Sequence, residues 1–543
     1  MIGAAKVVAF VLLGSTSLLA QTIDQGLKQI QADKIKDARN TFTQILNKEP
    51  NNIQALFYLA KIDLKEGKKD QAVEMFGKAA QADKKSPYFY VAQGFASMVK
   101  GDSANAFEQF DEAIDEVKAK DLKVIENIAD AYVLTESRNL KRPVDMLTKI
   151  KSNMKIEFSQ KAGIYEKLGD LYFKHGNYSQ AISNYKNAID ANSSVLFPYV
   201  GVGSVYVRIK NYGEAETYLN NALQADSTYA PAYKELAELY YTQNKYAQSA
   251  DMYKKYIQYS DADLSSKIRY AQIAYLSKNY QESLAALKAI ENEDPKNATI
   301  KHVIAWSYYS LDDAANAVPA FEQYFAVATD KEVSATDCEY YAKMLVKAGQ
   351  ETKAVDYYKK AIDLDSSRTD LYGDIAGIYF RSKDYSSAAK YYEAKMNSSS
   401  KALSVRDIRD LFDFGQAYFH LKEYVKADTV FSKITQIKDD IAQAHLWRAI
   451  VNSSIDSTSE MGLAKPHYEK FIELASKTPE KYTKNLAQAH AYLGYFYYLK
   501  RDDPQYKDTW EAEYKTNWEK VLQYDPENAQ AKEALKNTNT KKK

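Results

Sequence analysis

Small residues return every 34 positions along most of this chain. One register runs through Ala38, Ala72 and Ala106 and resumes at Ala181, Ala215, Ser249, Ser283 and Ala317. A second register stands twelve positions earlier, at Gly26, Ala60, Gly94, Gly169, Gly203, Ala237, Ala271 and Ala305. A fixed period of this length predicts a repeat protein, and two small side chains per unit predict two elements in close contact.

The residues beside these registers follow a helical spacing. Leu168, Gly169 and Tyr172 lie three or four positions apart, as do Ala181, Tyr185 and Ala188, which places each set on one helix face. Gly or Ala lets two backbones approach, and the neighbouring aromatic ring fills the space between units. No segment shows sustained strand alternation between turn signals, so we expect an all-helical chain.

This pattern resembles that of the tetratricopeptide repeat family. The residues that carry the resemblance are Tyr165, Leu168, Gly169, Tyr172, Ala181, Tyr185 and Ala188 in one unit and Tyr199, Val202, Gly203, Tyr206, Ala215, Leu219 and Ala222 in the next. The resemblance implies an all-α fold, an α-solenoid in which about fourteen helix pairs wind into a right-handed superhelix. It also implies that the first helix of each pair lines the concave face.

The phase of the repeat predicts an array over residues 21–538. Irregular units fall near 122–160, 397–407, 452–463 and 501–510, and they are either loops on a continuous scaffold or hinges between sub-arrays. In the fourth unit Lys141-Arg142-Pro143 interrupts the pattern, and we expect the proline to start its second helix. Residues 539–543 are predicted to form a disordered basic tail.

The N-terminus has the features of a secretory signal peptide over residues 1–20. Lys6 precedes the apolar run Val7 to Leu13, and a small-residue exit ends at Ala20. The uncharged stretch is shorter than the ~20 residues that span a bilayer, which disfavours the alternative of an uncleaved anchor. We therefore expect export, most simply to the periplasm of a Gram-negative bacterium, with peripheral attachment to the envelope as an alternative.

Composition excludes several classes of function. The chain has 73 Lys and Arg against 72 Asp and Glu, so no global basic field exists to hold nucleic acid. The single cysteine, Cys338, rules out an internal disulfide and is expected to be a small buried residue rather than a reactive thiol. The six histidines form no H-E-x-x-H pair, and no phosphate loop or nucleophile elbow is present. We expect no catalytic residues, no cofactor and no metal.

The family resemblance places a set of residues in the concave groove. They are Phe57, Tyr58, Lys61, Tyr88, Val91, Phe95 and Met98 near the N-terminus and Trp306 and Tyr309 further along, with further aromatic residues at Tyr492, Tyr495 and Tyr498. Between them lie charged positions at Glu126, Asp130, Glu166, Lys167, Asp170, Lys234, Glu235 and Glu238. Phe57, Tyr88 and Phe95 stand outside the packing register, which favours partner binding; the alternative is that these aromatic rings pack against neighbouring turns.

Two functional hypotheses of different kinds follow. The first is a non-catalytic scaffold of the cell envelope that binds a protein or peptide in the concave groove. The second is an architectural or accessory subunit of a secretion or polysaccharide assembly that binds through its convex face or ends, self-association included. An enzyme is a third, disfavoured alternative. The Lys and Asn clamp that chaperone-binding members of the family use is not reproduced, because Ile23, Phe57 and Val91 make those positions apolar.

Overall fold

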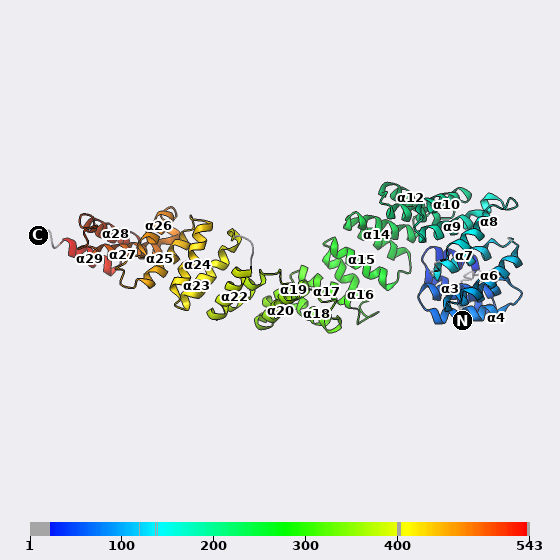
Figure 1. Ribbon diagram of the computed structural model, residues 1–543, viewed down its shortest axis with the longest axis horizontal. Helices are drawn as coiled ribbons and strands as arrows, with labels where there is room; N and C mark the ends of the chain where they lie inside the picture. Colours follow the sequence, from blue (N-terminus) through cyan, green and yellow to red (C-terminus); the bar gives the residue numbers. More distant parts are fainter. Residues whose placement is uncertain (1–21, 119, 136, 138, 399–402, 540–543) are drawn as a thin grey trace, which may run out of the picture. The chain divides into compact units, whose positions relative to one another are not determined.

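Helices joined by short turns make up the described chain, as the repeat pattern predicts (Figure 1). The computed structural model describes residues 22–118, 120–135, 137, 139–398 and 403–539. These residues contain 29 α-helices, two short 3-10 helices and no strand. The expected signal peptide and Lys541 to Lys543 lie outside the described residues. The chain divides into two compact units, unit 1 through Ser307 and unit 2 from Tyr308.

The helices of unit 1 alternate regularly between the first and second members of a pair. Their bounds are α1 (Ile23–Gln31), α2 (Ile35–Lys48), α3 (Ile53–Lys65), α4 (Lys69–Ala82), α5 (Pro87–Lys100), α6 (Ser103–Val117), α7 (Leu122–Leu134), α8 (Lys141–Lys151), η1 (Phe158–Lys161), α9 (Ala162–Lys174), α10 (Tyr178–Ala191), α11 (Phe197–Arg208), α12 (Tyr212–Ala225), α13 (Ala230–Thr242), α14 (Tyr246–Tyr259), α15 (Leu264–Leu276) and α16 (Tyr280–Ile290). Helix α17 (Ala298–Ser310) contains the division between the units.

Unit 2 continues the same alternation. Its helices are α18 (Ala314–Val327), α19 (Ala335–Lys347), α20 (Glu351–Leu364), α21 (Leu371–Arg381), α22 (Tyr385–Ser398), η2 (Val405–Asp407), α23 (Ile408–His420), α24 (Tyr424–Ile437), α25 (Ala442–Ile455), α26 (Lys465–Ala475), α27 (Pro479–Leu499), α28 (Trp510–Tyr524) and α29 (Ala529–Asn539). Pairs α1/α2 to α27/α28 give the expected fourteen helix pairs, and α29 follows them as a single helix.

Both small-residue registers lie where two helices cross. A Cβ atom at Gly169 would stand 2.5 Å from the ring of Tyr185, and one at Gly94 would stand 2.2 Å from that of Phe110. The register that begins at Ala38 is fully buried at Ala181 and Ala215. Where serine replaces alanine at this register, its hydroxyl donates to the first helix; Ser249 Oγ lies 2.7 Å from the carbonyl oxygen of Ala237. The steric explanation of the 34-residue period is therefore confirmed.

Replacing Gly169 with leucine is expected to destabilise unit 1 by about 1–3 kcal/mol or more, because the added side chain overlaps Tyr185. The loss should begin in the helix pairs beside α9, since neighbouring pairs carry the stability of a repeat array. Hydrogen exchange along the chain measures this. The matched control is Gly213→Leu, at a helical glycine whose Cβ would meet no atom within 4 Å. Equal exchange rates in both variants would contradict the assigned crossing.

Many of the first helices are followed by a residue whose backbone is in the left-handed region, with a positive φ angle. Gly176 has φ 78° and Lys210 has φ 63°. In both turns the amide of the following residue donates a hydrogen bond to a carbonyl in the last turn of the helix; for example, Asn177 N lies 2.9 Å from Tyr172 O. This bond satisfies a carbonyl that has no partner within the helix. This turn holds the two helices of a pair antiparallel.

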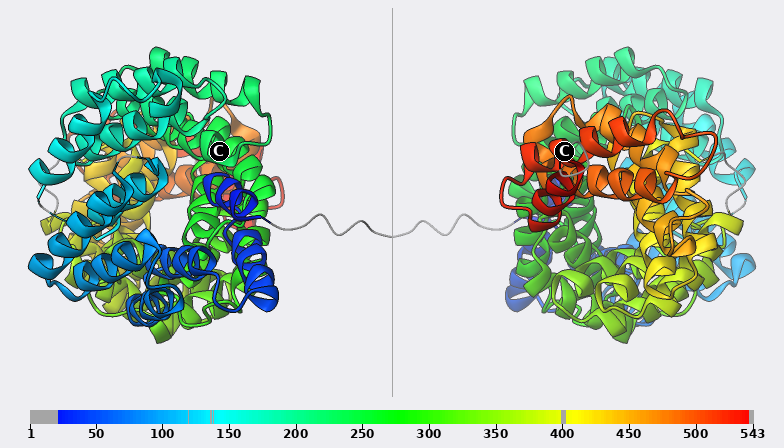
Figure 2. Two further views of the ribbon diagram at one scale, coloured as in Figure 1. Left: turned by 90° about the vertical axis from the view of Figure 1, so that its right-hand side faces the viewer. Right: turned by 90° about the vertical axis from the view of Figure 1, so that its left-hand side faces the viewer.

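Seven helix pairs of unit 1 form a closed circuit. Asp261, in the loop between α14 and α15, donates its amide to the carbonyl of Asp33 at 3.0 Å. Its Oδ2 accepts hydrogen bonds from the amides of Lys36 at 2.8 Å and Asp37 at 3.3 Å. These amides begin α2, which has no capping side chain next to it in the sequence. Figure 2 shows the blue N-terminal helices beside the green segment that contains this loop. We call this contact the Asp261 clasp.

Three of the irregular stretches lie within helix pairs: residues 122–160 contain the pair α7/α8, and residues 452–463 and 501–510 cover the turns inside the pairs α25/α26 and α27/α28. Pro143 is the third residue of α8 and so lies in its first turn, as expected for the start of this second helix. In the loop after α25, Asp456 Oδ2 accepts from the amide of Gly462 at 2.7 Å. The division between the two units falls within α17 and coincides with none of the irregular stretches.

Candidate functional site

Six of the seven predicted N-terminal groove residues, all except the half-buried Lys61, are buried and do not face an open groove. Phe57, Val91 and Phe95 are fully buried, and the exposed fractions of Tyr58, Tyr88 and Met98 are 2%, 3% and 8%. The Phe57 ring lies 5.3 Å from that of Phe95 and 5.5 Å from that of Phe76 on the second helix α4. The rings therefore form the core between α3, α4 and α5. This agrees with the alternative that the aromatic rings pack against neighbouring turns.

Strong curvature explains this burial. Lys61 on α3 reaches two pairs along the array, and its Nζ lies 2.7 Å from both Asn127 Oδ1 and Asp130 Oδ2 on α7. The hydroxyl groups of Tyr58 and Tyr88 lie 3.2 Å apart, and Asn127 Nδ2 donates to that of Tyr58 at 3.1 Å. Because α3 and α7 meet through these side chains, the chain itself fills the space that a partner would occupy.

Charged side chains from α3, α7 and α9 form the polar network, which is largely buried except at Lys123, whose side chain is 60% exposed. Its members are Lys61, Lys123, Glu126, Asp130, Glu166, Lys167 and Asp170. Lys167 Nζ lies at its centre, 3.1 Å from Asp130, 3.0 Å from Glu166 and 3.2 Å from Asp170. Four carboxylates thus share three ammonium groups, which leaves one negative charge without a counter-charge in the network.

Two aspartates of the polar network differ in their pKa. Burial opposes the ionisation of Asp130, but the ammonium groups of Lys167 and Lys61 outweigh burial and lower its pKa to about 2. Burial raises the pKa of Asp170 to about 6, with Lys167 opposing and the carboxylate of Glu166 reinforcing the shift. Carboxyl groups with raised pKa values occur at functional sites and also in structural ion networks.

Replacing Asp170 with asparagine is expected to stabilise unit 1 at neutral pH. A raised pKa means that the neutral carboxyl favours the fold; this contribution is complete below pH 3.8 and is lost as the pH rises through about 6. Asparagine keeps the neutral form, so the variant should match the native chain near pH 4 and exceed it by about 2 kcal/mol at pH 7.5. Urea unfolding at both pH values measures the difference, and a less stable variant at pH 7.5 would overturn the assignment.

A second group of side chains on first helices is more accessible. Tyr241 on α13, Arg269 and Tyr275 on α15, and His302 and Trp306 on α17 are all half-buried. The Arg269 guanidinium lies 3.9 Å from the Tyr241 ring centroid. The Trp306 ring lies 6.0 Å from that of Tyr275 and 4.7 Å from that of His302. We call these five residues the aromatic row.

The aromatic row contains one residue that the sequence singled out and four that it did not. Trp306 was a predicted groove residue, and it is half-buried. Arg269 also binds Glu238, with its Nη2 3.2 Å from Oε2. Tyr241, Arg269, Tyr275 and His302 were missed, although they stand on the first helices of successive repeats, as Trp306 does. The 34-residue period links Tyr241 and Tyr275 to the predicted Tyr309 and so gave a signal for these two, whereas it gave none for Arg269 and His302.

Other predicted aromatic residues lie in unit 2. Tyr309 is half-buried and stacks on Tyr340 with ring centroids 3.8 Å apart. Tyr492 packs against Tyr468 at 4.8 Å. Tyr495 and Tyr498 on α27 are exposed, by 48% and 45%, and the Arg501 guanidinium lies 4.6 Å from the Tyr498 ring.

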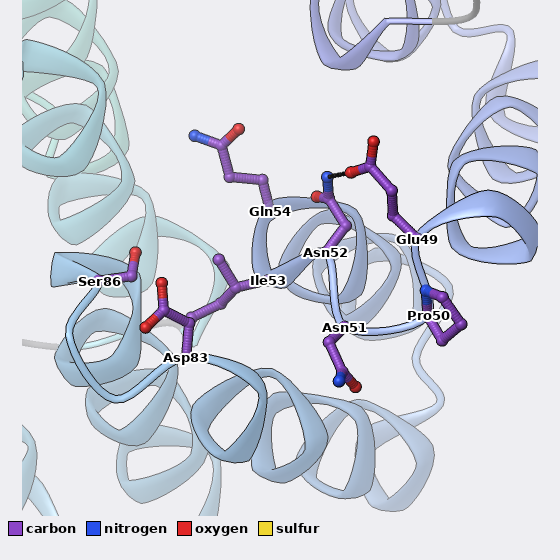
Figure 3. Close-up of a pocket in the computed structure, with 8 residues that line it drawn as sticks. All are labelled: Glu49, Pro50, Asn51, Asn52, Ile53, Gln54, Asp83 and Ser86. Carbon is purple, nitrogen blue, oxygen red and sulfur yellow. Dashed lines mark hydrogen bonds between the residues drawn. The ribbon is translucent and has the colours of Figure 1, made fainter.

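A shallow pocket of about 510 Å³ lies at turns of the first three pairs (Figure 3). Its lining comprises Glu49, Pro50, Asn51, Asn52, Ile53, Gln54, Asp83 and Ser86. Asn52 Nδ2 donates to Glu49 Oε2 at 2.8 Å, and Asn52 also caps α3. The pocket is therefore lined by polar turn residues that already serve local structure.

The side chains of Cys338 and His490 lie in surroundings that suit a structural role. Cys338 is fully buried as predicted, and burial raises the pKa of its thiol to about 11, which keeps it protonated. His490 Nδ1 lies 2.8 Å from Asn517 Oδ1. Within the described ranges, no three His, Cys, Asp or Glu side chains gather in a way that would hold a metal ion. No helix in that part of the chain has the length and apolar character of a membrane span.

The helix pairs with small residues at their crossings define the class of protein as an α-solenoid of repeats. Models of the tetratricopeptide repeat match residues 166–231, 234–298 and 341–368, and a model described as the TT21 fifth ARM repeats domain matches residues 28–126. The C-terminal part of a TPR repeat-containing protein from Cytophaga hutchinsonii is 32% identical over 49% of this chain and 99% of that one, with a TM-score of 0.40. The chain belongs to the tetratricopeptide repeat family.

Two other solved structures are similar at lower identity. YrrB, described as a TPR protein with an unusual peptide-binding site, is 16% identical over 34% of this chain and 92% of its own, with a TM-score of 0.31. Pseudomonas aeruginosa pilF is 15% identical over 46% of this chain and 95% of its own, with a TM-score of 0.27. No curated protein matches the sequence. Membership of this repeat family supports a protein-binding scaffold as the general class.

Proposed function

We propose that this protein is a non-catalytic scaffold of the cell envelope that holds a partner polypeptide along the first helices of unit 1. The observation that carries the proposal is the aromatic row. The residues that dominate the binding energy of protein interfaces are enriched in tryptophan, tyrosine and arginine, and here such residues are half-buried on three successive first helices, α13, α15 and α17. The aromatic row includes no residue of the polar network and none of the aromatic core between α3, α4 and α5.

Selection of dodecapeptides from a displayed random library on the full chain tests the proposal. Peptides that bind along the row should lose about tenfold or more in affinity to the Trp306→Ala variant, as for an aromatic hot spot. Tyr495→Ala, at an exposed tyrosine of unit 2, is the matched control and should bind normally. Peptides that bind both variants equally would refute the use of the row.

The alternative is an accessory subunit that binds through its convex face or its end. This alternative is favoured by two exposed tyrosines on the last helix pair, Tyr495 and Tyr498, and by Arg501, which lies against the Tyr498 ring. The same selection separates the two proposals, because binding at this end would be lost in Tyr495→Ala and kept in Trp306→Ala.

The envelope location has its own test. Residues 1–20 have the composition of a signal peptide. Fractionation of the native host followed by N-terminal sequencing should find a periplasmic chain that begins at Gln21. A cytosolic chain with an intact N-terminus would refute export while leaving the scaffold proposal in place.

A further inference from the structure

The Asp261 clasp joins two parts of unit 1 that have separate apolar cores. The core that contains Phe42 and Ile45 of α2 draws its residues from α1 to α9. The core that contains Ala262, next to the clasp, draws its residues from α12 to α16. Within the described residues, neither α1 nor α2 packs along α13, α14 or α15. Opening the clasp would therefore divide neither core, and so it avoids the largest cost of separating packed helices.

The hydrogen bonds of the clasp are accessible to water. Those from the amides of Lys36 and Asp37 to Asp261 Oδ2, at 2.8 and 3.3 Å, are both exposed. Water replaces such bonds when they break, so each contributes only modestly to the closed state. The closed state keeps an advantage, because the first amides of α2 lack partners within the helix and the helix dipole favours a carboxylate beside them.

Each side of the clasp is held in shape by its own hydrogen bonds. In the loop that carries Asp261, Asp263 caps α15, and its Oδ1 lies 2.7 Å from the amide of Ser266. In the turn between α1 and α2, Lys34 donates its amide to the carbonyl of Gln29 at 2.8 Å. Loop and turn therefore keep their shape when they part, and closing the clasp again requires no local folding.

Charges near the clasp add a further attraction. Asp33 forms an ion pair with Lys65 of α3 at 3.3 Å, on its own side of the contact. On the other side, burial lowers the pKa of Lys234 on α13, but Tyr256, Asp33 and the more distant Glu235 outweigh burial and raise it. Attraction between Lys234 and Asp33 thus adds to the hydrogen bonds that favour the closed state.

We propose that the Asp261 clasp is a reversible latch that opens and closes the circuit of helix pairs in unit 1. In the open state the loop of Asp261 leaves the α1–α2 turn, while the polar network still joins α3, α7 and α9. The helices beyond α9 then move as one arm, because neighbouring pairs keep their own cores. This arm includes α13 and α15, so the latch sets the position of Tyr241 and Arg269 relative to α1 and α2.

Distances between two spin labels test the latch in the full chain. The labels are attached through Asn47→Cys on α2 and Gln258→Cys on α14, both at exposed positions, with the buried Cys338 replaced by alanine. The labelled chain should show mainly one distance, that of the closed circuit. Adding Asp261→Ala should raise the ratio of longer to closed distances by about tenfold, as expected for losing hydrogen bonds to a charged acceptor. The matched control is Ser227→Ala, at the exposed position 34 residues earlier, and it should leave the ratio unchanged.

Hydrogen exchange on the same variants separates opening from unfolding. In Asp261→Ala the amides of Lys36 and Asp37 should exchange faster, whereas those inside α3 to α5 and α13 to α15 should keep their native rates. An unchanged distance distribution in Asp261→Ala would overturn the latch, because the circuit would then be closed without the clasp. Longer distances together with faster exchange inside α14 or α15 would also overturn it, since the change would then be local unfolding.

Discussion

Replacing Phe57 with serine is expected to lower the free energy of unfolding of the first helix pairs by about 3–5 kcal/mol. The Phe57 ring is fully buried and touches four other rings, those of Tyr58, Phe76, Tyr88 and Phe95. Serine would leave a cavity among them and bury a hydroxyl. Hydrogen exchange of the full chain measures the loss, which should be greatest in α3 to α5.

Phe158→Ser is the matched control for this substitution. Phe158 is 49% exposed, so its loss should cost far less. A ring that serves partner binding, as the sequence pattern favours for Phe57, would contribute little to stability. Equal stability of the two serine variants would support partner binding by Phe57 and contradict its place in the core.

The repeat units were predictable because their determinants are local. Gly169 and Tyr185 lie sixteen positions apart within one helix pair, and the same relation recurs at Gly94 and Phe110 and at Gly415 and Phe431. A period of 34 residues therefore reports helix number, pairing and crossing points directly. The burial of Cys338 follows from the same register.

The candidate site was less predictable because it depends on curvature. Lys61 meets Asp130 two pairs away, and Asp261 meets Lys36 across 225 residues. Such contacts arise from a small rotation between neighbouring pairs that accumulates along the array, and no single repeat encodes that rotation. The sequence therefore named the charged residues Asp130, Glu166 and Lys167 but could not indicate that they form one network.

The same limit explains the error at the N-terminal groove. Position within a first helix determines which way a side chain points, but not whether another helix already occupies that space. At Tyr58 and Lys61 the occupant is α7, through Asn127 and Asp130. At Trp306 the side chain keeps partial exposure. The repeat equivalent of the fully buried Phe57 is the half-buried His302, so one position of the repeat differs in exposure between two parts of unit 1.

Replacing Asp130 with asparagine is expected to cost about 3–5 kcal/mol, because it leaves two buried ammonium groups without their shared counter-charge. Asp130 lies 2.7 Å from Lys61 and 3.1 Å from Lys167, and its side chain is 19% exposed. Asparagine has nearly the same volume, so the loss measures charge rather than packing. Urea unfolding of unit 1 in the full chain gives the value.

The pH dependence of this loss distinguishes an ion network from a simple packing defect. The pKa of Asp130 is lowered to about 2 in the fold, so the ionised carboxylate stabilises the native state at every pH above 3.8, and this contribution is lost as the pH falls through about 2. The deficit of Asp130→Asn should therefore be constant from pH 5 to pH 8 and shrink below pH 4. Asp111→Asn, in an exposed ion pair with Arg142, should cost less than about 1 kcal/mol. A deficit at Asp130 that is as small as the one at Asp111 would mean that the polar network does not hold α3, α7 and α9 together.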